Sequence, residues 1–261
     1  MRITEVRSLL VRIPLERPVR IATREVRGRE FVLTFVKTDD GRQGVGYTYA
    51  GTVGGTMVRA AVDDVLAPVL VGGDADLIEH HWAAMFQQGL LVGRRGALLR
   101  AISALDIALW DLAAQRANLP LYRLLGGFQA EVPAYASGGY YREGKGTTGL
   151  AQEMERYLRA GFDAVKIKVG GVSEWLKVAH TAASFDLPVA PHWHADLHMH
   201  LVGAVTNALT VEYFFLEEDI YNFERILAER IAPSGGRIRI PDWPGLGLVL
   251  DDAAVERFAI R

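Results

Sequence analysis

Two lysines in the middle of the chain have the spacing of a proton-transfer pair. Lys166 and Lys168 interrupt a short apolar run that extends from Gly161 to Gly171. Side chains alternate along a β-strand, so both lysines would lie on one face and the apolar residues on the other. Two ammonium groups held this close repel each other, so one can lose its proton near neutral pH and act as a general base. The spacing alone also fits a strand whose lysines point into water.

A histidine-rich run follows at residues 192–200. His192 and His194 would share one face at the end of a predicted strand, where βα barrels carry their catalytic groups. His198 lies four residues after His194, with Asp196 between them. Imidazoles grouped in this way could converge on Zn²⁺, so a site formed by His192, His194 and His198 is one interpretation of the run. The alternative is that His194, His198 and His200 make local capping or substrate contacts.

The elements that would position these groups change in type along the chain. Residues 3–13, 31–37 and 43–49 are predicted to form an antiparallel sheet. The charged segment from Pro14 to Gly28 is too long for a hairpin turn, and we expect a loop, which at this length is often either a functional lid or disordered. Helical spacing of apolar residues predicts three helices, over 56–70, 76–91 and 95–118, with Asp74 as the N-cap of the second.

After Gly127 short strands alternate with helices, which predicts βαβ units and a parallel sheet. The strands are expected at 132–137, 164–169, 188–192 and 210–216. The helices are expected at 148–160, 173–184, 196–207 and 222–231. Residues 238–261 contain prolines and a glycine turn, and we expect an irregular return across the molecule.

The composition excludes several classes of protein. Half of the 261 residues are hydrophobic, the net charge is -2 and there are no cysteines. Disulfides and thiolate metal sites are therefore excluded. No bulk positive charge indicates nucleic acid, and no apolar run is long enough for a signal peptide or a membrane span. We expect a cytoplasmic protein.

Four motifs, in order, resemble the mandelate racemase and muconate lactonizing enzyme branch of the enolase superfamily. Residues 96–127, with Ala-Ile-Ser-Ala-Leu-Asp-Ile-Ala-Leu-Trp-Asp at 101–111, are similar to the helix that closes the family's capping domain. Lys166-Ile167-Lys168 is similar to its general-base motif. His192 and Glu212, twenty residues apart, resemble its strand-seven histidine and strand-eight glutamate, and residues 240–247 resemble its C-terminal return.

The resemblance implies a (β/α)₇β barrel that binds a small carboxylate substrate through Mg²⁺. It also implies removal of the proton next to the carboxylate, as in racemases and acid-sugar dehydratases. The enolase superfamily is an established example of this metal-assisted proton abstraction. Lys168 would be the base and Lys166 the neighbour that lowers its pKa. His192 would be the base on the opposite face, and Glu212 would hydrogen-bond the substrate carboxylate or its intermediate. The resemblance also suggests Thr23 and His194 as substrate contacts.

Half of that barrel is missing. Lys168 and His192 are 24 residues apart, whereas the family's three acidic metal ligands lie between the two motifs and a full barrel needs about 250 residues. Strand two is joined to helix six at residues 169–171, so the family's Mg²⁺ is expected but its ligands are absent from this chain. We therefore predict an α+β capping domain at 1–126, a partial (β/α) TIM-type barrel of about four βα units at 127–235, and a C-terminal segment at 236–261 that returns to the capping domain.

Three functional interpretations remain open: a working metal-assisted racemase or dehydratase, a non-catalytic binding or structural relative, and an unselected deletion product. Four βα units would leave an open parallel sheet with two bare edges, which is rare. Two copies could close an eight-stranded barrel about a two-fold axis, so we expect a homodimer or higher homo-oligomer. A misfolded remnant, or a monomer whose capping domain and tail shield the sheet, are the alternatives.

Overall fold

The computed structural model describes residues 1–21, 24–136, 152, 156, 159, 160, 172–183 and 188–260. The sequence predictions for Thr23, Lys166, Lys168 and the strand at 164–169 lie outside these residues, as does most of the predicted helix at 148–160.

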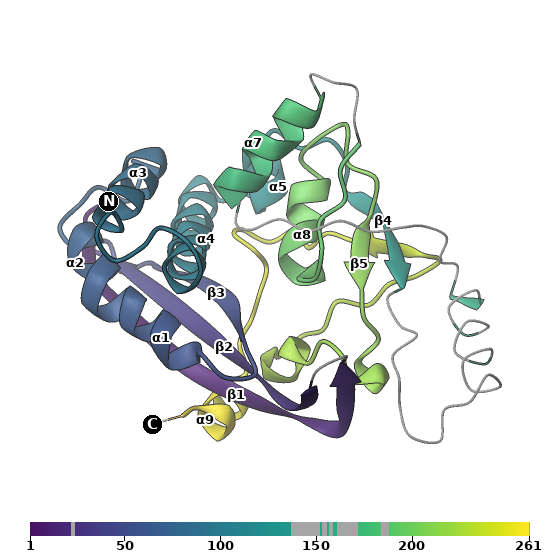
Figure 1. Cartoon of the computed structure of the whole chain (residues 1–261). Helices are drawn as coiled ribbons and strands as arrows, with labels where there is room; N and C mark the ends of the chain where they lie inside the picture. The colour runs from purple at the N-terminus through teal and green to yellow at the C-terminus, as the bar shows by residue number, and fades with distance from the viewer. Residues whose placement is uncertain are drawn as a thin grey trace.

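The N-terminal sheet is antiparallel, with strand order β1-β2-β3 (Figure 1). The strands are β1 (Ile3–Ile21), β2 (Arg24–Thr38) and β3 (Gln43–Gly51). The predicted loop from Pro14 to Gly28 is wrong over the residues that the structure describes, because β1 and β2 extend into the segment from its two ends and pair there, Val19 with Val26. A register shift between Pro14 and Val19 takes up the irregularity. Proline has no N–H to give to a ladder, whereas the β-branched residues beyond the shift favour renewed pairing.

Helices cover one face of this sheet. Residues 55–70 form a continuous helical rod, as predicted, made of α1 (Gly55–Ala60), the π-helical turn η1 (Ala61–Leu66) and α2 (Ala67–Leu70). The rod is followed by α3 (Ile78–Gln88) and α4 (Ala97–Ala117), and α4 ends at Asn118 in the left-handed conformation. Asp74 is not the N-cap of α3, which begins after Leu77 without a side-chain cap. The Asp74 carboxylate instead accepts hydrogen bonds from the N-terminal ammonium group and from the Asp76 N–H, each at 3.2 Å.

Helix α4 packs directly on β3 through two glycines. A Cβ atom on Gly44 would come within 2.1 Å of the Ala108 carbonyl oxygen, and one on Gly46 within 1.9 Å of the Ala104 carbonyl oxygen. Only glycine allows the helix and the strand to approach this closely. The long apolar helix is buried as a result, and it forms the centre of the capping-domain core.

Both faces of the sheet are buried, because alternate residues of each strand enter different cores. Leu10 and Val32 join the core under the helices. Val11 and Phe31 join a second core with Phe214 and other residues from the C-terminal half of the chain. This second core holds the capping sheet against the other half of the protein.

The C-terminal half contains a small mixed sheet of order β5-β4-β6. Strand β4 (Glu131–Ala136) pairs in parallel with β5 (Val211–Tyr213) and in antiparallel with β6 (Arg237–Arg239). The helices α5 (Leu121–Leu124), α7 (Val172–Ala183) and α8 (Ala195–Val202) pack around it. Among the described residues, the parallel pair β4–β5 is the part that resembles a barrel sheet. That this half contains about four βα units stays a prediction.

The strand predicted at 210–216 is shortened to β5 (Val211–Tyr213), and three further predicted elements in this half are wrong in extent. The strand at 188–192 is reduced to one parallel bridge between Val189 and Ala208. Helix α8 ends at residue 202 rather than 207, because the Gly203 carbonyl accepts hydrogen bonds from residues 128 and 129. The helix at 222–231 is only the 3₁₀ turn η3 (Phe223–Ile226), since Leu227 turns away to pair with Leu250. In each case a contact distant in sequence overrides the local pattern.

The C-terminal segment returns to the capping domain with more order than its composition predicts. After β6, the N–H of Leu246 donates to Asp111 of α4 at 3.1 Å. The last helix, α9 (Asp252–Phe258), lies beside β1, where the N–H of Ile260 donates to the Leu10 carbonyl at 2.9 Å. No helix among the described residues has both the length and the apolar character needed to cross a membrane.

Candidate active site at the seam between the two halves

Two predicted site residues, His192 and Glu212, contact each other in the structure. Glu212 lies on β5 and is fully buried, whereas the His192 side chain is 18% exposed. The His192 Nε2 and Glu212 Oε2 atoms are 3.4 Å apart. Glu212 is held in place by the Trp193 N–H, which donates to the same Oε2 atom at 2.7 Å. The arrangement thus places a partly accessible imidazole beside a carboxylate at the end of a barrel-type strand.

The backbone after His192 takes an unusual course. Trp193 and His194 both have positive φ angles, 76° and 25°, before α8 begins. A left-handed conformation in a residue other than glycine costs on the order of 1–3 kcal/mol and persists only where surrounding contacts impose it. Here the contacts are the hydrogen bond to Glu212 and the packing of both side chains against the capping domain.

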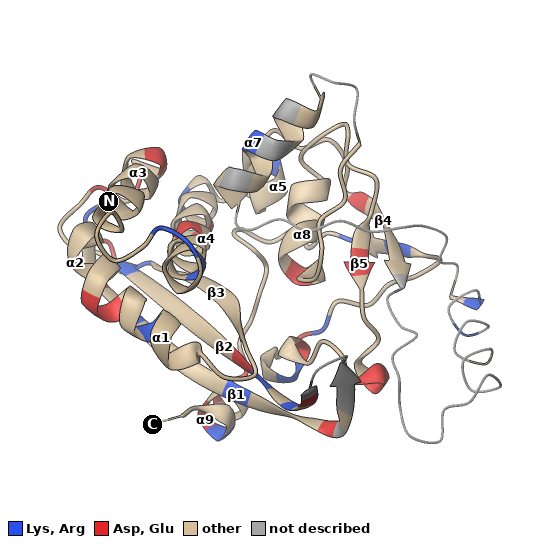
Figure 2. Cartoon of the chain, viewed as in Figure 1, with Lys and Arg blue, Asp and Glu red and all other residues tan. Residues whose placement is uncertain are grey.

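A buried hydrogen-bond network joins the two halves beside this turn. Asp196, in the first turn of α8, accepts hydrogen bonds from the hydroxyl groups of Tyr47 and Tyr221. Tyr47 comes from β3 of the capping sheet and stacks on Phe223 with ring centroids 4.0 Å apart. Nδ1 of His194 lies 3.1 Å from the Tyr221 hydroxyl oxygen and extends the network toward the turn at Trp193. In Figure 2 the acidic residue of α8 and that of β5 are the red segments of these two elements.

Burial is the largest cause of the pKa shifts at this seam, the contact between the capping sheet and the C-terminal half of the protein. It raises the pKa of Asp196 to about 6, although the two tyrosine hydrogen bonds act in the opposite direction. Burial also lowers the pKa of His194 well below its usual value, that of His198 to about 3 and that of His200 to about 4. These three imidazoles are therefore neutral at neutral pH, and none of them supplies a positive charge for an anionic substrate.

The predicted Zn²⁺ site at His192, His194 and His198 is wrong. The described part of the chain brings no three histidine, aspartate or glutamate side chains together as a metal site requires. The histidines are directed to different partners: His194 to Tyr221, His198 to the backbone of Trp193, and His200, through Nε2, to the Leu246 carbonyl at 2.9 Å. The chain leaves its strand path at Trp193, so the run does not keep the regular geometry that convergence assumes.

The described residues also lack a suitable set of ligands for the family's Mg²⁺. A Mg²⁺ site uses carboxylate oxygens, and the acidic residues of the seam are already engaged. Asp196 accepts from two tyrosines, and Glu212 accepts from Trp193 and faces His192. The residues that the structure describes do not fit a Mg²⁺ site of three acidic ligands.

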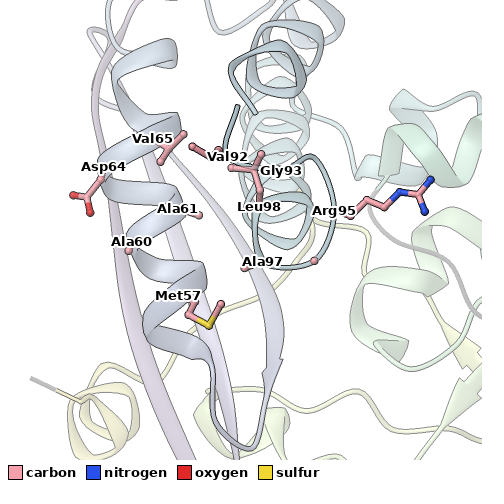
Figure 3. Close-up of a pocket in the computed structure, with 11 residues that line it drawn as sticks. Met57, Ala60, Ala61, Asp64, Val65, Val92, Gly93, Arg95, Ala97 and Leu98 are labelled. Carbon is pink, nitrogen blue, oxygen red and sulfur yellow. The ribbon is translucent and has the colours of Figure 1, made fainter. Parts of the chain in front are cut away.

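A hollow of about 510 Å³ elsewhere in the capping domain has a different character (Figure 3). It lies between the rod at 55–70 and the segment at 92–98, and its lining is largely apolar. Asp64 and Arg95 are its charged lining residues, and the Arg95 side chain is directed away from it. This lining offers no pair of groups suited to proton transfer, so the hollow does not compete with the seam as the active site.

The structure adds residues that the sequence did not single out. Tyr47, Tyr221 and Trp193 all contact the predicted site residues, yet nothing in their local sequence distinguishes them from ordinary core aromatics. His194, predicted as a substrate contact, lies within hydrogen-bond distance of the Tyr221 hydroxyl group, and its contact with a substrate stays a prediction. Its neighbour Asp196 could be suspected from the sequence, because it stands among the histidines.

Comparison with known proteins gives a consistent result. Residues 3–126 match the profile of the mandelate racemase / muconate lactonizing enzyme N-terminal domain, and residues 167–254 match that of the enolase C-terminal domain-like family. Arabinonate dehydratase from Saccharolobus solfataricus is 37% identical over 166 residues, which are 62% of this chain and 44% of the relative. D-galactarolactone cycloisomerase from Agrobacterium fabrum is 35% identical over 214 residues, 81% of this chain and 55% of the relative. The chain spans about half the length of these curated relatives.

Solved structures show the same fold. A racemase from Streptomyces coelicolor A3(2) with bound magnesium superposes with a TM-score of 0.88 at 25% identity, covering 99% of this chain and 100% of that one. L-talarate dehydratase from Polaromonas sp. JS666, complexed with Mg and L-glucarate, also has a TM-score of 0.88, at 23% identity, with 100% and 98% covered.

Proposed function

Because the chain belongs to the mandelate racemase and muconate lactonizing enzyme family of the enolase superfamily, we propose that it binds a sugar acid and exchanges the proton next to its carboxylate. The observation that carries this proposal is the His192–Glu212 pair, in which a partly exposed imidazole lies 3.4 Å from a buried carboxylate. Relatives that match the chain are named as sugar-acid dehydratases and cycloisomerases, which supports a hydroxylated acid as the substrate class.

In this proposal the imidazole of His192 is the base. The Cα–H bond of the substrate breaks, the proton passes to the imidazole, and the electron pair delocalises into the carboxylate to give an enediolate. Return of a solvent-exchanged proton to the same face gives exchange, and protonation of the opposite face gives racemisation. When the imidazolium instead passes its proton to a β-hydroxyl group, the Cβ–O bond breaks, water leaves and the product is the dehydrated acid. Glu212 orients the imidazole and is itself held by the Trp193 N–H. Lys168 and its neighbour Lys166 are proposed to act from the opposite face of the substrate, as the family motif implies.

The rate of this reaction should be low in the isolated chain. Electrostatic stabilisation of the charge that develops in the transition state usually contributes more to catalysis than any other effect. No step is assigned to a metal, because the described residues do not supply its ligands. The same observation favours a second candidate function, a protein that binds a sugar acid without turning it over.

A deuterium-exchange experiment separates the two functions. The protein is incubated in D₂O with a panel of 2-hydroxy and sugar acids, with and without Mg²⁺, and deuterium at the α-carbon is followed by NMR. Exchange should fall about 10²-fold in His192→Gln and also in Lys168→Ala, but not in His80→Gln, whose exposed imidazole lies on α3. Exchange that persists in His192→Gln refutes the assigned base. Binding without exchange in the parent protein indicates the second function.

We also propose that two chains associate through their barrel halves. In the described sheet β5 is an edge strand, paired with β4 alone. Unpaired edges of parallel sheets are normally covered, and a second copy offers an edge of the same kind.

A further inference from the structure

One arginine at the seam is buried among aromatic rings. Arg29, in the strand β2, is 6% exposed. Its guanidinium carbon lies 5.1 Å from the centroid of the Trp193 ring and 5.7 Å from that of the Tyr49 ring. Nη1 donates a hydrogen bond to the Tyr49 hydroxyl group at 3.1 Å. The capping sheet therefore places a permanent positive charge against the residue that follows His192.

Two buried N–H donors at this place have no acceptor in the part of the chain that the structure describes. They are Nε of Arg29 and Nε1 of Trp193. No acidic side chain among the described residues forms an ion pair with Arg29 either, whereas its neighbour Glu30 is paired with Arg12. A buried charge without a counter-charge is costly, and so is each unsatisfied donor. Contact with aromatic faces offsets only part of the cost for the cation.

The unsatisfied donors have the chemistry of a carboxylate site. The Nε edge of an arginine is one side of the planar fork that binds carboxylates with two parallel hydrogen bonds. The indole N–H of Trp193 is a neighbouring donor, and tryptophan can only donate. The backbone of Trp193 meanwhile holds Glu212 beside His192. A carboxylate bound by Arg29 would thus lie against Trp193, which follows His192 in the chain and holds Glu212 through its backbone N–H.

We propose that Arg29, with Trp193, binds the second carboxylate of a sugar diacid and makes the protein prefer dicarboxylic over monocarboxylic sugar acids. This inference rests on the proposed function, because it assumes that the first carboxylate of the same molecule is bound beside His192. Arg29 is a specificity-determining residue in this scheme and takes no part in proton transfer. A buried water molecule could satisfy the same donors, but it would create no preference between the two acids.

Isothermal titration calorimetry with glucarate and gluconate tests the inference, because the two acids differ in the oxidation of one terminal carbon. The parent protein should bind glucarate about tenfold more tightly than gluconate, as a charge-assisted hydrogen-bonding site implies. Arg29→Gln should remove this preference, because glucarate should lose about tenfold in affinity relative to gluconate. Arg7→Gln is the matched control, since Arg7 is an exposed arginine that lies 3.8 Å over the Phe35 ring of the same sheet. It should keep the full preference.

The outcomes distinguish this inference from the proposed function. Equal affinity for the two acids in the parent protein, or an unchanged preference in Arg29→Gln, overturns the role of Arg29 and leaves the proposed function standing. Binding of neither acid overturns both. If Arg29→Gln does not fold, as judged by thermal unfolding, Arg29→Lys decides the matter. Lysine keeps the charge and lacks the planar fork, so most of the preference should be lost, and full retention would refute the assignment.

Discussion

Replacing Asp196 by Asn should change how the stability of the protein depends on pH. The Asp196 carboxyl group lies at the junction of the two halves and accepts hydrogen bonds from Tyr47 and Tyr221. Burial raises its pKa from 3.8 to about 6. A carboxyl group whose pKa is higher in the folded state stabilises the fold when protonated, so its contribution is complete below pH 3.8 and is lost as the pH rises through 6. Asparagine has a similar shape and does not titrate.

The size of the effect follows from the two pKa values. Between pH 7 and pH 5 the wild-type protein should gain about 1.3 kcal/mol of unfolding free energy relative to Asp196→Asn. The buried histidines change stability in the opposite direction: the lowered pKa values of His198 and His200 stabilise the fold above pH 6.5, and this stability is lost as the pH falls toward their folded-state values. Both proteins contain these histidines, so their effect cancels in the difference.

The measurement is urea unfolding of both proteins at pH 5 and pH 7. Glu224 lies near Asp196, and its pKa of about 8, raised mainly by burial and further by the charge of Asp196, keeps it protonated at both pH values. The unfolding free energy of Asp196→Asn should therefore fall relative to that of the wild type when the pH is lowered from 7 to 5. A difference in unfolding free energy that stays constant between the two pH values, or changes in the opposite sense, would show that Asp196 is not buried between the two halves.

Three other predictions concern the same contacts. Tyr47→Phe should lower the unfolding free energy by about 1–2 kcal/mol in urea, because it removes one donor from the buried Asp196 carboxylate; the control Tyr122→Phe, whose hydroxyl accepts from the partly exposed Arg123 side chain, should change it by less than about 0.5 kcal/mol. Asp111→Asn should lower the unfolding free energy by about 2 kcal/mol, since one amide oxygen cannot replace a carboxylate that accepts from two backbone N–H groups and a glutamine. Limited proteolysis should then cut the C-terminal segment of this variant sooner than that of the wild type. Sedimentation equilibrium at micromolar concentration should show a dimer, and a monomer at every concentration would refute the proposed association through β5.

Much of the capping domain could be predicted from local patterns. The three-stranded meander and the helices over 55–70, 78–88 and 97–117 follow from period-two and helical spacing, and their ends differ from prediction by a few residues. The hairpin through Pro14 could not be predicted in the same way, because its prolines suggested a loop. Pairing between Val19 and Val26 depends on both strands being present, which the pattern within either segment alone cannot include.

Of the candidate site, the sequence alone determined the residue types, the family and the choice of His192 and Glu212 as separate site residues, whereas their contact was found only in the structure. Motifs of fixed spacing at the ends of predicted strands identified these residues, because βα barrels carry their catalytic groups there. The tertiary structure decided how the site is held: the left-handed turn at Trp193, the separation of the histidines, and the Tyr47–Asp196 contact across 149 residues of chain. These features arise where side chains from segments distant in sequence share the same buried hydrogen-bond donors and acceptors. The periodicity of residues within one segment contains no information about such contacts.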